Sequence, residues 1–404
     1  MLKDKFRNPD LLLLLLYIFY CAAIVLRVSV EGTGYLSPDS EYYLEAARSL
    51  KAGEGFFIRD LYGLHSRRTG SIAYFSAWPI GYPTLVALVS LTSGLKLFWA
   101  SKFINLLFAG LGFLLMRHIN RQYAFVLASV YGAFTIIEMY SYTWSECVFM
   151  FGCLCFVVLL HEVYISGKVV LVYALLATAI FMFLIRYIGF FSGGLILLLA
   201  LLTWLDDRKS VSRHLLIAFG LNLLFVCIYV LHNYYVAGYN TDAQRLTENM
   251  ERPAEVFFMA IKGLVIELFI IRKYYLNGSP GILTVATAVL QFSVIGYIWK
   301  LLRAESNRVT GAIKCNTLSH IAILVAFAYL LVLVYLRTIS QFDSLDYRLL
   351  SPFTFIMLFA VVNYIVALPD QLKGVRFAKL LIFSFFLVSV LLNLPKQYLL
   401  SLLL

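Results

Sequence analysis

Long, continuous apolar segments run through most of this 404-residue chain. Hydrophobic residues make up 62% of it and charged residues 14%, whereas soluble globular domains have about 45–50% and 25%. A helix that crosses a bilayer needs about 20 predominantly apolar residues. The segments do not alternate polar and apolar positions, which excludes an outer-membrane barrel. The composition also excludes a soluble enzyme, a disordered chain and a secreted disulfide scaffold. A multi-pass helical membrane protein is left.

The positions of these segments show where the chain can cross the membrane. They cover residues 11–30, 80–95, 98–116, 123–137, 147–160, 169–185, 188–204, 215–231, 282–299, 318–336, 349–368 and 380–394. The first is too long for a signal-peptide core and lacks a small-residue cleavage site, so we predict an uncleaved span. The segment at 80–95 contains Gly81 and Pro83 near its start and scattered Ser and Thr. It is therefore the candidate that does not cross.

The distribution of basic residues supports this choice. The chain has 33 Lys and Arg against 22 Asp and Glu, a formal charge of +11. Short cytoplasmic loops of membrane proteins are enriched in Lys and Arg. If residues 80–95 lie in the interface, the N-terminus and every basic cluster fall on the cytoplasmic side; these clusters lie at 117–121, 208–213, 300–314 and 373–379. The net positive charge is then explained by the basic residues of the cytoplasmic loops. Nucleic-acid binding is not expected, because no basic helix with interleaved aromatics lies outside the apolar segments.

The predicted fold class is all-α: a multi-pass bundle of about eleven spans, with interfacial helices in the first outer loop. Residues 1–404 are expected to form a single membrane domain with outer loops at about 31–98 and 232–281. The first loop contains a predicted helix at 39–51, and the second contains an amphipathic stretch at 254–271. Any chemistry is expected to face outward.

Acidic residues lie near the predicted outer ends of two spans. Asp39 and Glu41 follow the first span, where a helix start would aim backbone N–H groups at Asp39. Asp39 is therefore either a functional carboxylate or an N-cap. Glu146 opens a later span, where a carboxylate bordered by apolar helices is costly. It is either a functional group or a helix cap.

Two arginines lie at comparable positions. Arg186 separates two apolar segments, and Arg348 lies where an outer loop meets a span. An arginine within a membrane segment indicates function by default. Snorkelling to the interface explains Arg186 equally well, and pairing with Asp343 or Asp346 explains Arg348. Arg68 is a further cation of the first outer loop, where most charges are expected to be ordinary surface groups.

Motifs for cytoplasmic nucleotide chemistry are absent from the sequence. It has no phosphate-cradling P-loop, no G-x-G-x-x-G after a strand, no G-x-S-x-G and no H-E-x-x-H. No cofactor is predicted. The few carboxylates, which lack a D-x-D motif, leave a divalent metal undecided.

Several short motifs follow one another in a characteristic order. They are D-S-E-Y-Y with downstream glycines at 39–56, W-P-I-G-Y-P at 78–83, S-E at 145–146, R-x-x-G at 186–189 and R-x-x-x-P at 348–352. This order resembles the GT-C superfamily of integral membrane glycosyltransferases, and most closely its protein O-mannosyltransferase and aminoarabinose-transferase-like branch. The resemblance covers roughly residues 11–368. It departs at Ser40, because many members have adjacent Asp and Glu at this point.

The resemblance implies roles for individual residues. Asp39 matches the catalytic position and Glu146 the second acidic position, with Glu41 as a further candidate catalytic carboxylate. Arg348 and Arg186 match cations near the donor phosphate, and Arg68 is a candidate for the same role. In that family the first outer loop carries the catalytic carboxylate and folds into helices along the membrane.

The resemblance also implies a reaction and its partners. Family members move a sugar from a polyprenyl-phosphate donor to an acceptor on the outer face; the acceptor is a glycan, a lipid or a protein. One displacement at the anomeric carbon, with Asp39 as general base, inverts configuration. Tyr42, Tyr43, Trp78 and Tyr82 are candidates for a wall beside the sugar. The expected location is a bacterial inner (plasma) membrane, in contact with membrane lipid, with the N-terminus cytoplasmic.

Two other functions fit a multi-pass chain. A transporter or flippase of lipid-linked sugars often shows inverted repeats and broken spans near the midplane, and we see no repeat. A polysaccharide polymerase or ligase is expected to use Arg and His in its outer loops, and His65 is the one histidine of the first loop.

Overall fold

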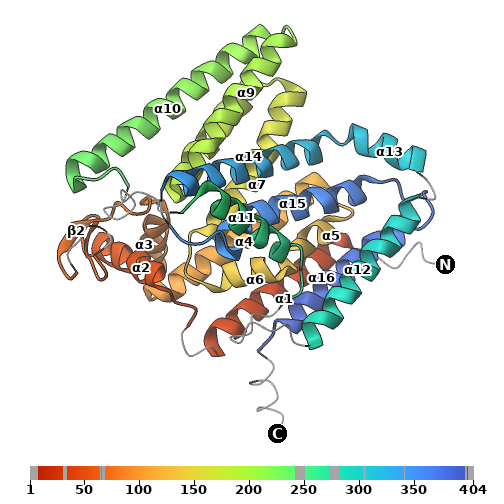
Figure 1. Ribbon diagram of the computed structural model, residues 1–404, viewed down its shortest axis with the longest axis horizontal. Coiled ribbons are helices and arrows are strands. Elements are labelled where there is room, and N and C mark those ends of the chain that lie inside the picture. Colours follow the sequence, from red (N-terminus) through yellow and green to blue (C-terminus); the bar gives the residue numbers. More distant parts are fainter. Residues whose placement is uncertain are drawn as a thin grey trace.

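The computed structural model describes residues 8–30, 34–63, 65, 69–241, 251–272, 282–303, 306–340, 342–395 and 398. Its long helices run alongside one another (Figure 1). They are α1 (Pro9–Val30), α4 (Leu97–Ile119), α7 (Glu146–Ser166), α8 (Val169–Ile185), α9 (Phe191–Leu205), α10 (Lys209–Ala237), α12 (Ile282–Arg303), α14 (Thr317–Ile339), α15 (Tyr347–Ala367) and α16 (Val375–Leu392). The shorter elements are α2 (Pro38–Lys51), β1 (Phe57–Arg59), β2 (Ile72–Tyr74), α3 (Gly81–Ser93), α5 (Ala124–Ala128), η1 (Ser129–Gly132), α6 (Phe134–Ser141), η2 (Tyr187–Phe190), α11 (Pro253–Glu267) and α13 (Ser306–Cys315).

The number of helices that can cross a membrane is close to the eleven spans predicted from the sequence. Nine helices in the described part of the chain are long and apolar enough to cross a membrane. The α5–η1 and α6 pair, bent by 71°, makes a tenth span if it counts as one. The 17-residue α8 extends about 26 Å. Each of these eleven elements coincides with a segment that we predicted to cross. The all-α multi-pass fold class is confirmed, and the protein is an integral membrane protein.

Helix α3 is the segment predicted to lie in the interface. Its 13 residues extend about 20 Å, less than the roughly 30 Å of a bilayer's hydrocarbon core. It packs against α2 and α4. Gly81 at its start lies so close to the carbonyl of Leu184 that an added Cβ would be 2.5 Å from that oxygen. The glycine therefore lets the first outer loop approach the end of α8.

The first outer loop is built as the sequence predicts, with one addition. Helix α2 begins after Ser37, whose hydroxyl accepts a hydrogen bond from the Ser40 N–H at 3.3 Å. The addition is an antiparallel hairpin, in which Phe57 of β1 is opposite Tyr74 of β2. This hairpin contacts the end of α10, where the Tyr74 hydroxyl is 3.4 Å from His232 Nε2. Helices α2 and α3 and the hairpin gather at the left of Figure 1.

In the second outer loop, the amphipathic stretch predicted at 254–271 contains most of helix α11, which ends at Glu267. Beyond α11, the chain turns so that the Ile270 carbonyl accepts a hydrogen bond of 2.9 Å from the Phe134 N–H. This contact joins the end of α11 to the start of α6.

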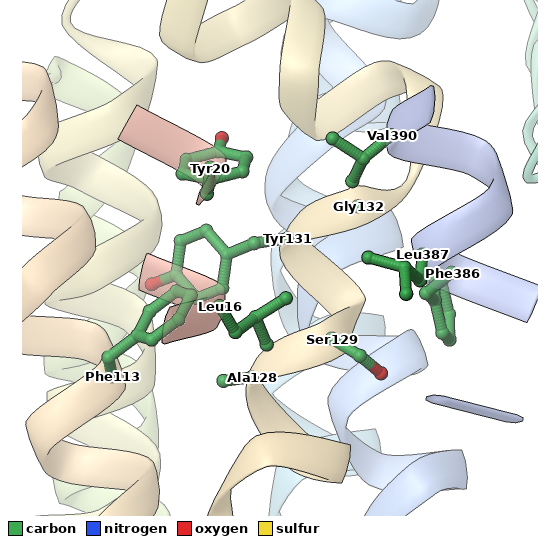
Figure 2. A pocket seen from close by; sticks show the side chains of 10 residues that line it. All are labelled: Leu16, Tyr20, Phe113, Ala128, Ser129, Tyr131, Gly132, Phe386, Leu387 and Val390. Carbon is green, nitrogen blue, oxygen red and sulfur yellow. The ribbon is translucent and has the colours of Figure 1, made fainter. Parts of the chain in front are cut away.

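The bend between η1 and α6 lies inside the bundle. At Gly132, an added Cβ would be 2.7 Å from the Phe386 carbonyl oxygen of α16. A residue without a Cβ is therefore required for this close approach. A small cavity beside the bend is lined mainly by apolar groups of α1, α4 and α16 and by the rings of Tyr20 and Tyr131 (Figure 2). It contains none of the predicted site residues.

Candidate active site

Four charged residues singled out in the sequence come together in one group, which we call the ion cluster: Asp39, Glu146, Arg186 and Arg348. Asp39 lies in the first turn of α2, Glu146 begins α7, Arg186 follows α8 and Arg348 lies in the first turn of α15. The ends of four elements therefore meet at one place. The prediction that these residues share one side of the bundle agrees with this geometry.

Glu146 is the centre of the ion cluster. It is fully buried, and its Oε1 atom is paired with Arg186 Nη1 and with Arg348 Nε, the latter at 2.7 Å. Its Oε2 atom has no hydrogen-bond partner among the described residues. A buried carboxylate is costly unless it is paired. The two guanidinium groups and the N-terminus of α7 supply that compensation, so Glu146 holds the two arginines beside each other.

Arg348 is held in place from several directions. The Asp346 carboxylate caps α15 by accepting the Arg348 N–H at 2.9 Å, and burial raises the pKa of Asp346. The Arg348 side chain pairs with Glu146 and with Asp39, and its Nη1 atom is 3.6 Å from the exposed Asp343. Its guanidinium carbon lies 4.4 Å from the centroid of the Trp144 ring. Pairing with Asp346, one alternative from the sequence, is not observed.

Asp39 is the accessible carboxylate of the ion cluster. Its side chain is 17% exposed, compared with 1% for Glu146. The hydroxyl of Ser37 is the N-cap of α2, so the alternative in which Asp39 serves only as N-cap is wrong. The N-terminus of α2 still favours negative charge at Asp39. Asp39 is therefore the carboxylate of the ion cluster that an incoming group can contact.

The link between α6 and α7 contributes residues that sequence reasoning did not identify. Trp144 stacks on Tyr142, with ring centroids 4.0 Å apart, and its indole N–H donates to Ser37 at 2.7 Å. The hydroxyls of Tyr43 and Ser145 are 3.0 Å apart, and burial raises the pKa of Tyr43. The signal was present in the sequence, because aromatic and hydroxyl residues precede Glu146 directly. Their partners depend on the tertiary fold.

Two polar side chains of α4 hold this same link. The Asn105 amide donates to the carbonyl oxygens of Tyr140 and Tyr142, at 3.2 and 2.8 Å. The Lys102 ammonium donates to the carbonyl oxygen of Ser141 at 2.6 Å. Both side chains are buried. They satisfy backbone groups that α6 leaves unpaired at its end, and thereby set the position from which Trp144 and Glu146 extend.

Of the remaining charged residues predicted for the site, Glu41 lies apart from the ion cluster. The Glu41 carboxylate is exposed and accepts a hydrogen bond of 2.7 Å from the Tyr62 hydroxyl, which raises the pKa of Tyr62. Its separation from Asp39 by Ser40 turns it to another side of α2. Arg68 lies outside the described residues.

The four candidate wall residues require a correction. Tyr42, Tyr43 and Tyr82 are fully buried and Trp78 is 8% exposed. Their rings pack on one another, with Tyr43 5.5 Å from Trp78 and 5.1 Å from Tyr82 between centroids. Instead of facing a sugar, they form the core of the first outer loop. Large aromatic rings bury much apolar area, and here they pack together with the fully buried Phe75.

In the part of the chain that the structure describes, no three His, Cys, Asp or Glu side chains converge as ligands for a metal ion. The carboxylates of Asp39 and Glu146 face guanidinium groups instead.

Comparison with known proteins identifies the fold. No protein-family model and no curated protein sequence matches the chain. The structure is similar to that of ArnT from Cupriavidus metallidurans bound to undecaprenyl phosphate, with a TM-score of 0.54 and 13% identity over 96% of this chain and 75% of that one. It is also similar to the archaeal oligosaccharyltransferase AglB from Archaeoglobus fulgidus in complex with an inhibitory peptide and a dolichol-phosphate. There the TM-score is 0.52, with 12% identity over 97% of this chain and 56% of that one. The GT-C-like fold predicted from the motif order is confirmed.

Proposed function

We propose that this protein is a glycosyltransferase that moves a sugar from a polyprenyl-phosphate carrier to a glycan, lipid or protein acceptor. The observation that carries the proposal is the ion cluster, in which the partly exposed carboxylate of Asp39 pairs with Arg348 and Glu146 joins Arg348 to Arg186. The fold supports it, because the similar ArnT and AglB structures contain undecaprenyl phosphate and a dolichol-phosphate. A multi-pass bundle also suits a donor whose carrier is a membrane lipid.

In the proposed reaction, Asp39 acts as general base. It takes a proton from an acceptor hydroxyl or amine as that group attacks the anomeric carbon. The bond from this carbon to the phosphate oxygen breaks, and the electron pair stays with the polyprenyl phosphate. A single displacement of this kind inverts the configuration. A positioned general base typically contributes about 10²- to 10⁴-fold to the rate.

The two arginines have an electrostatic role in this proposal. Negative charge grows on the departing phosphate, and guanidinium groups stabilise it through charge-assisted hydrogen bonds. Glu146 was expected as a second catalytic carboxylate. Because it is buried and paired with both Arg186 and Arg348, we assign it the positioning of those arginines instead.

The proposed orientation places this site on the extracytoplasmic face of a bacterial inner membrane, with the N-terminus in the cytoplasm. The support is the basic residues at the opposite ends of the spans. Reporter fusions after residues 120 and 210 test this orientation, and both are expected to report the cytoplasmic side. Outer-side signals from both would contradict it.

The reaction is tested with the purified protein in lipid nanodiscs and a panel of polyprenyl-phosphate sugars. Mass spectrometry of the extracted lipid, glycan and protein identifies the product. Asp39→Asn is expected to reduce transfer about 10²- to 10⁴-fold without unfolding the protein. Glu45→Gln is the matched control, since it removes a carboxylate of the same helix that pairs with Arg48 at the surface. Undiminished transfer by Asp39→Asn would disprove the proposed base.

A further inference from the structure

We infer that Asp39 also controls donor binding: it occupies Arg348 in the free protein, and the donor phosphate must displace it before transfer begins. This inference rests on the proposed function and adds an order of events to it. The donor enters first, its phosphate takes the place of the Asp39 carboxylate on Arg348, and the released carboxylate then serves the acceptor. Asp39 therefore competes with the substrate whose reaction it supports.

In the free protein, most of the Arg348 guanidinium is already in contact with other side chains. Its Nε atom donates to Glu146 at 2.7 Å and its Nη2 atom pairs with Asp39. The Trp144 ring covers one face at 4.4 Å. Nη1 has only a long contact, 3.6 Å, to Asp343. An arginine binds phosphate most strongly through two parallel N–H groups. The Nη1 and Nη2 pair can serve this purpose once Asp39 leaves.

Burial determines which carboxylate leaves. Glu146 is fully buried and pairs with both Arg186 and Arg348, so its departure would leave Arg186 without a carboxylate partner among the described residues. Asp39 is partly exposed and pairs with Arg348 alone among the described residues. The ion cluster has two positive and two negative side chains. Adding a phosphate with Asp39 still in place would set an anion against an anion, whereas exchange keeps the charges balanced.

The start of α2 makes the displaced position suitable for a base. The helix is capped by Ser37 through the Ser40 N–H, independently of Asp39. The Ser37 hydroxyl is itself fixed by the Trp144 indole at 2.7 Å. Asp39 can therefore rotate away from Arg348 without uncapping α2, and the helix N-terminus still stabilises its negative charge.

Binding of a soluble donor analogue tests this exchange. Farnesyl phosphate is titrated into the wild-type protein and into Asp39→Asn and Asp39→Ser variants in nanodiscs, by calorimetry. Both variants are expected to bind it more tightly than the wild type, by about tenfold or more, because each lacks the competing ion pair. Thermal unfolding of each variant establishes that it is folded. Farnesol, which lacks the phosphate, is expected to bind all three proteins equally.

Asp343→Asn is the matched control for charge. It removes a carboxylate near the same guanidinium, but an exposed one at 3.6 Å, so its effect on binding should be less than about twofold. Equal or weaker farnesyl phosphate binding by both Asp39 variants would overturn the inference. Equal tightening by Asp343→Asn, or tightening of farnesol as well, would also overturn it. The transfer assay is separate: loss of transfer without tighter binding would leave the proposed function standing and remove only this exchange.

Discussion

Two buried glutamate–arginine pairs in this protein have opposite surroundings. In the ion cluster, one oxygen of Glu146 pairs with two arginines, and its other oxygen lacks a hydrogen-bond partner among the described residues. The second group, which we call the Glu267 cluster, consists of Glu267, Arg272, Thr135 and Thr354. There Oε1 of Glu267 pairs with Arg272, while Oε2 accepts hydrogen bonds from Thr135 and Thr354, both at 2.8 Å.

The difference indicates that the ion cluster is a functional site and that the Glu267 cluster stabilises the fold. In the Glu267 cluster, both carboxylate oxygens are satisfied and every member is at least 90% buried. It connects α11 to α6 and α15 through side chains that are themselves buried. The ion cluster instead includes Asp39, which is partly exposed. Buried polar groups that are fully satisfied make a structure rigid, whereas incomplete satisfaction beside an accessible carboxylate indicates a place for a ligand.

Removal of Glu146 should have the largest effect. Glu146→Ala removes the carboxylate that Arg186 shares with the buried Arg348. We expect a loss of about 3–5 kcal/mol in stability, together with loss of transfer. Thermal unfolding in detergent and the transfer assay measure the two effects. Glu146→Gln, which keeps the shape and loses the charge, should show the same direction. Full transfer activity in either variant would contradict a functional role for the ion cluster.

Removal of Glu267 should affect stability alone. Glu267→Ala leaves Arg272 without its carboxylate and two threonine hydroxyls without their acceptor. The expected loss in stability is at most the same, about 3–5 kcal/mol. Transfer per folded molecule should be preserved, because no residue of the Glu267 cluster touches the ion cluster. The comparison fails if the folded fraction of this variant is inactive.

Substitution of Asn105, which holds the link between α6 and α7, should have an effect of intermediate size on stability and transfer. Asn105→Ala leaves the carbonyl oxygens of Tyr140 and Tyr142 without their donor, at a cost of about 1–3 kcal/mol. Because the link positions Trp144 and Glu146, kcat should fall more than the KM for the donor rises. Asn222→Ala is the control: Asn222 is also buried, but its amide nitrogen has no partner among the described residues. Equal effects of the two substitutions would rule out a positioning role for Asn105.

The smallest expected effect lies at the opposite end of the bundle. Burial tends to raise the pKa of Asp370, but hydrogen bonds from Lys379, at 2.8 Å, and Tyr123 outweigh it and lower that pKa. A lowered carboxylate pKa stabilises the fold above the unfolded value and loses this contribution as the pH falls through the folded value. The wild type should therefore exceed Asp370→Asn in stability at pH 7, by less than about 1 kcal/mol. The advantage should shrink below about pH 4. A difference that does not change with pH would contradict this.

Much of the fold could be predicted from the sequence because membrane insertion depends on local properties. The apolar segments became helices nearly one for one, and Ser37 with Pro38 marked the start of α2. The hydrogen bond between Ile270 and Phe134, beyond the end of α11, could not be predicted in this way. Such a contact joins elements far apart in the chain and leaves no periodic signal.

Some residues of the candidate site could also be predicted from the sequence, whereas others could not. Asp39, Glu146, Arg186 and Arg348 were identifiable individually, since a charge beside apolar spans is costly and calls for an explanation. The aromatic residues of the first loop were misassigned because interfacial aromatics look alike in sequence whether they face a ligand or pack together. Trp144 was not identified at all, although it lies two residues before Glu146.

By itself, the sequence determined that this chain crosses the membrane many times, which ends of the spans carry its basic residues, and which few charges need partners. Those properties follow from the transfer free energy of each segment and from local charge bias. Only the tertiary structure decided that one glutamate holds two arginines, that Asp39 and not Glu41 joins them, and that Trp144 lies against Arg348. Pairings of this kind depend on distances between helix ends that are far apart in the sequence, and packing, not local pattern, sets those distances.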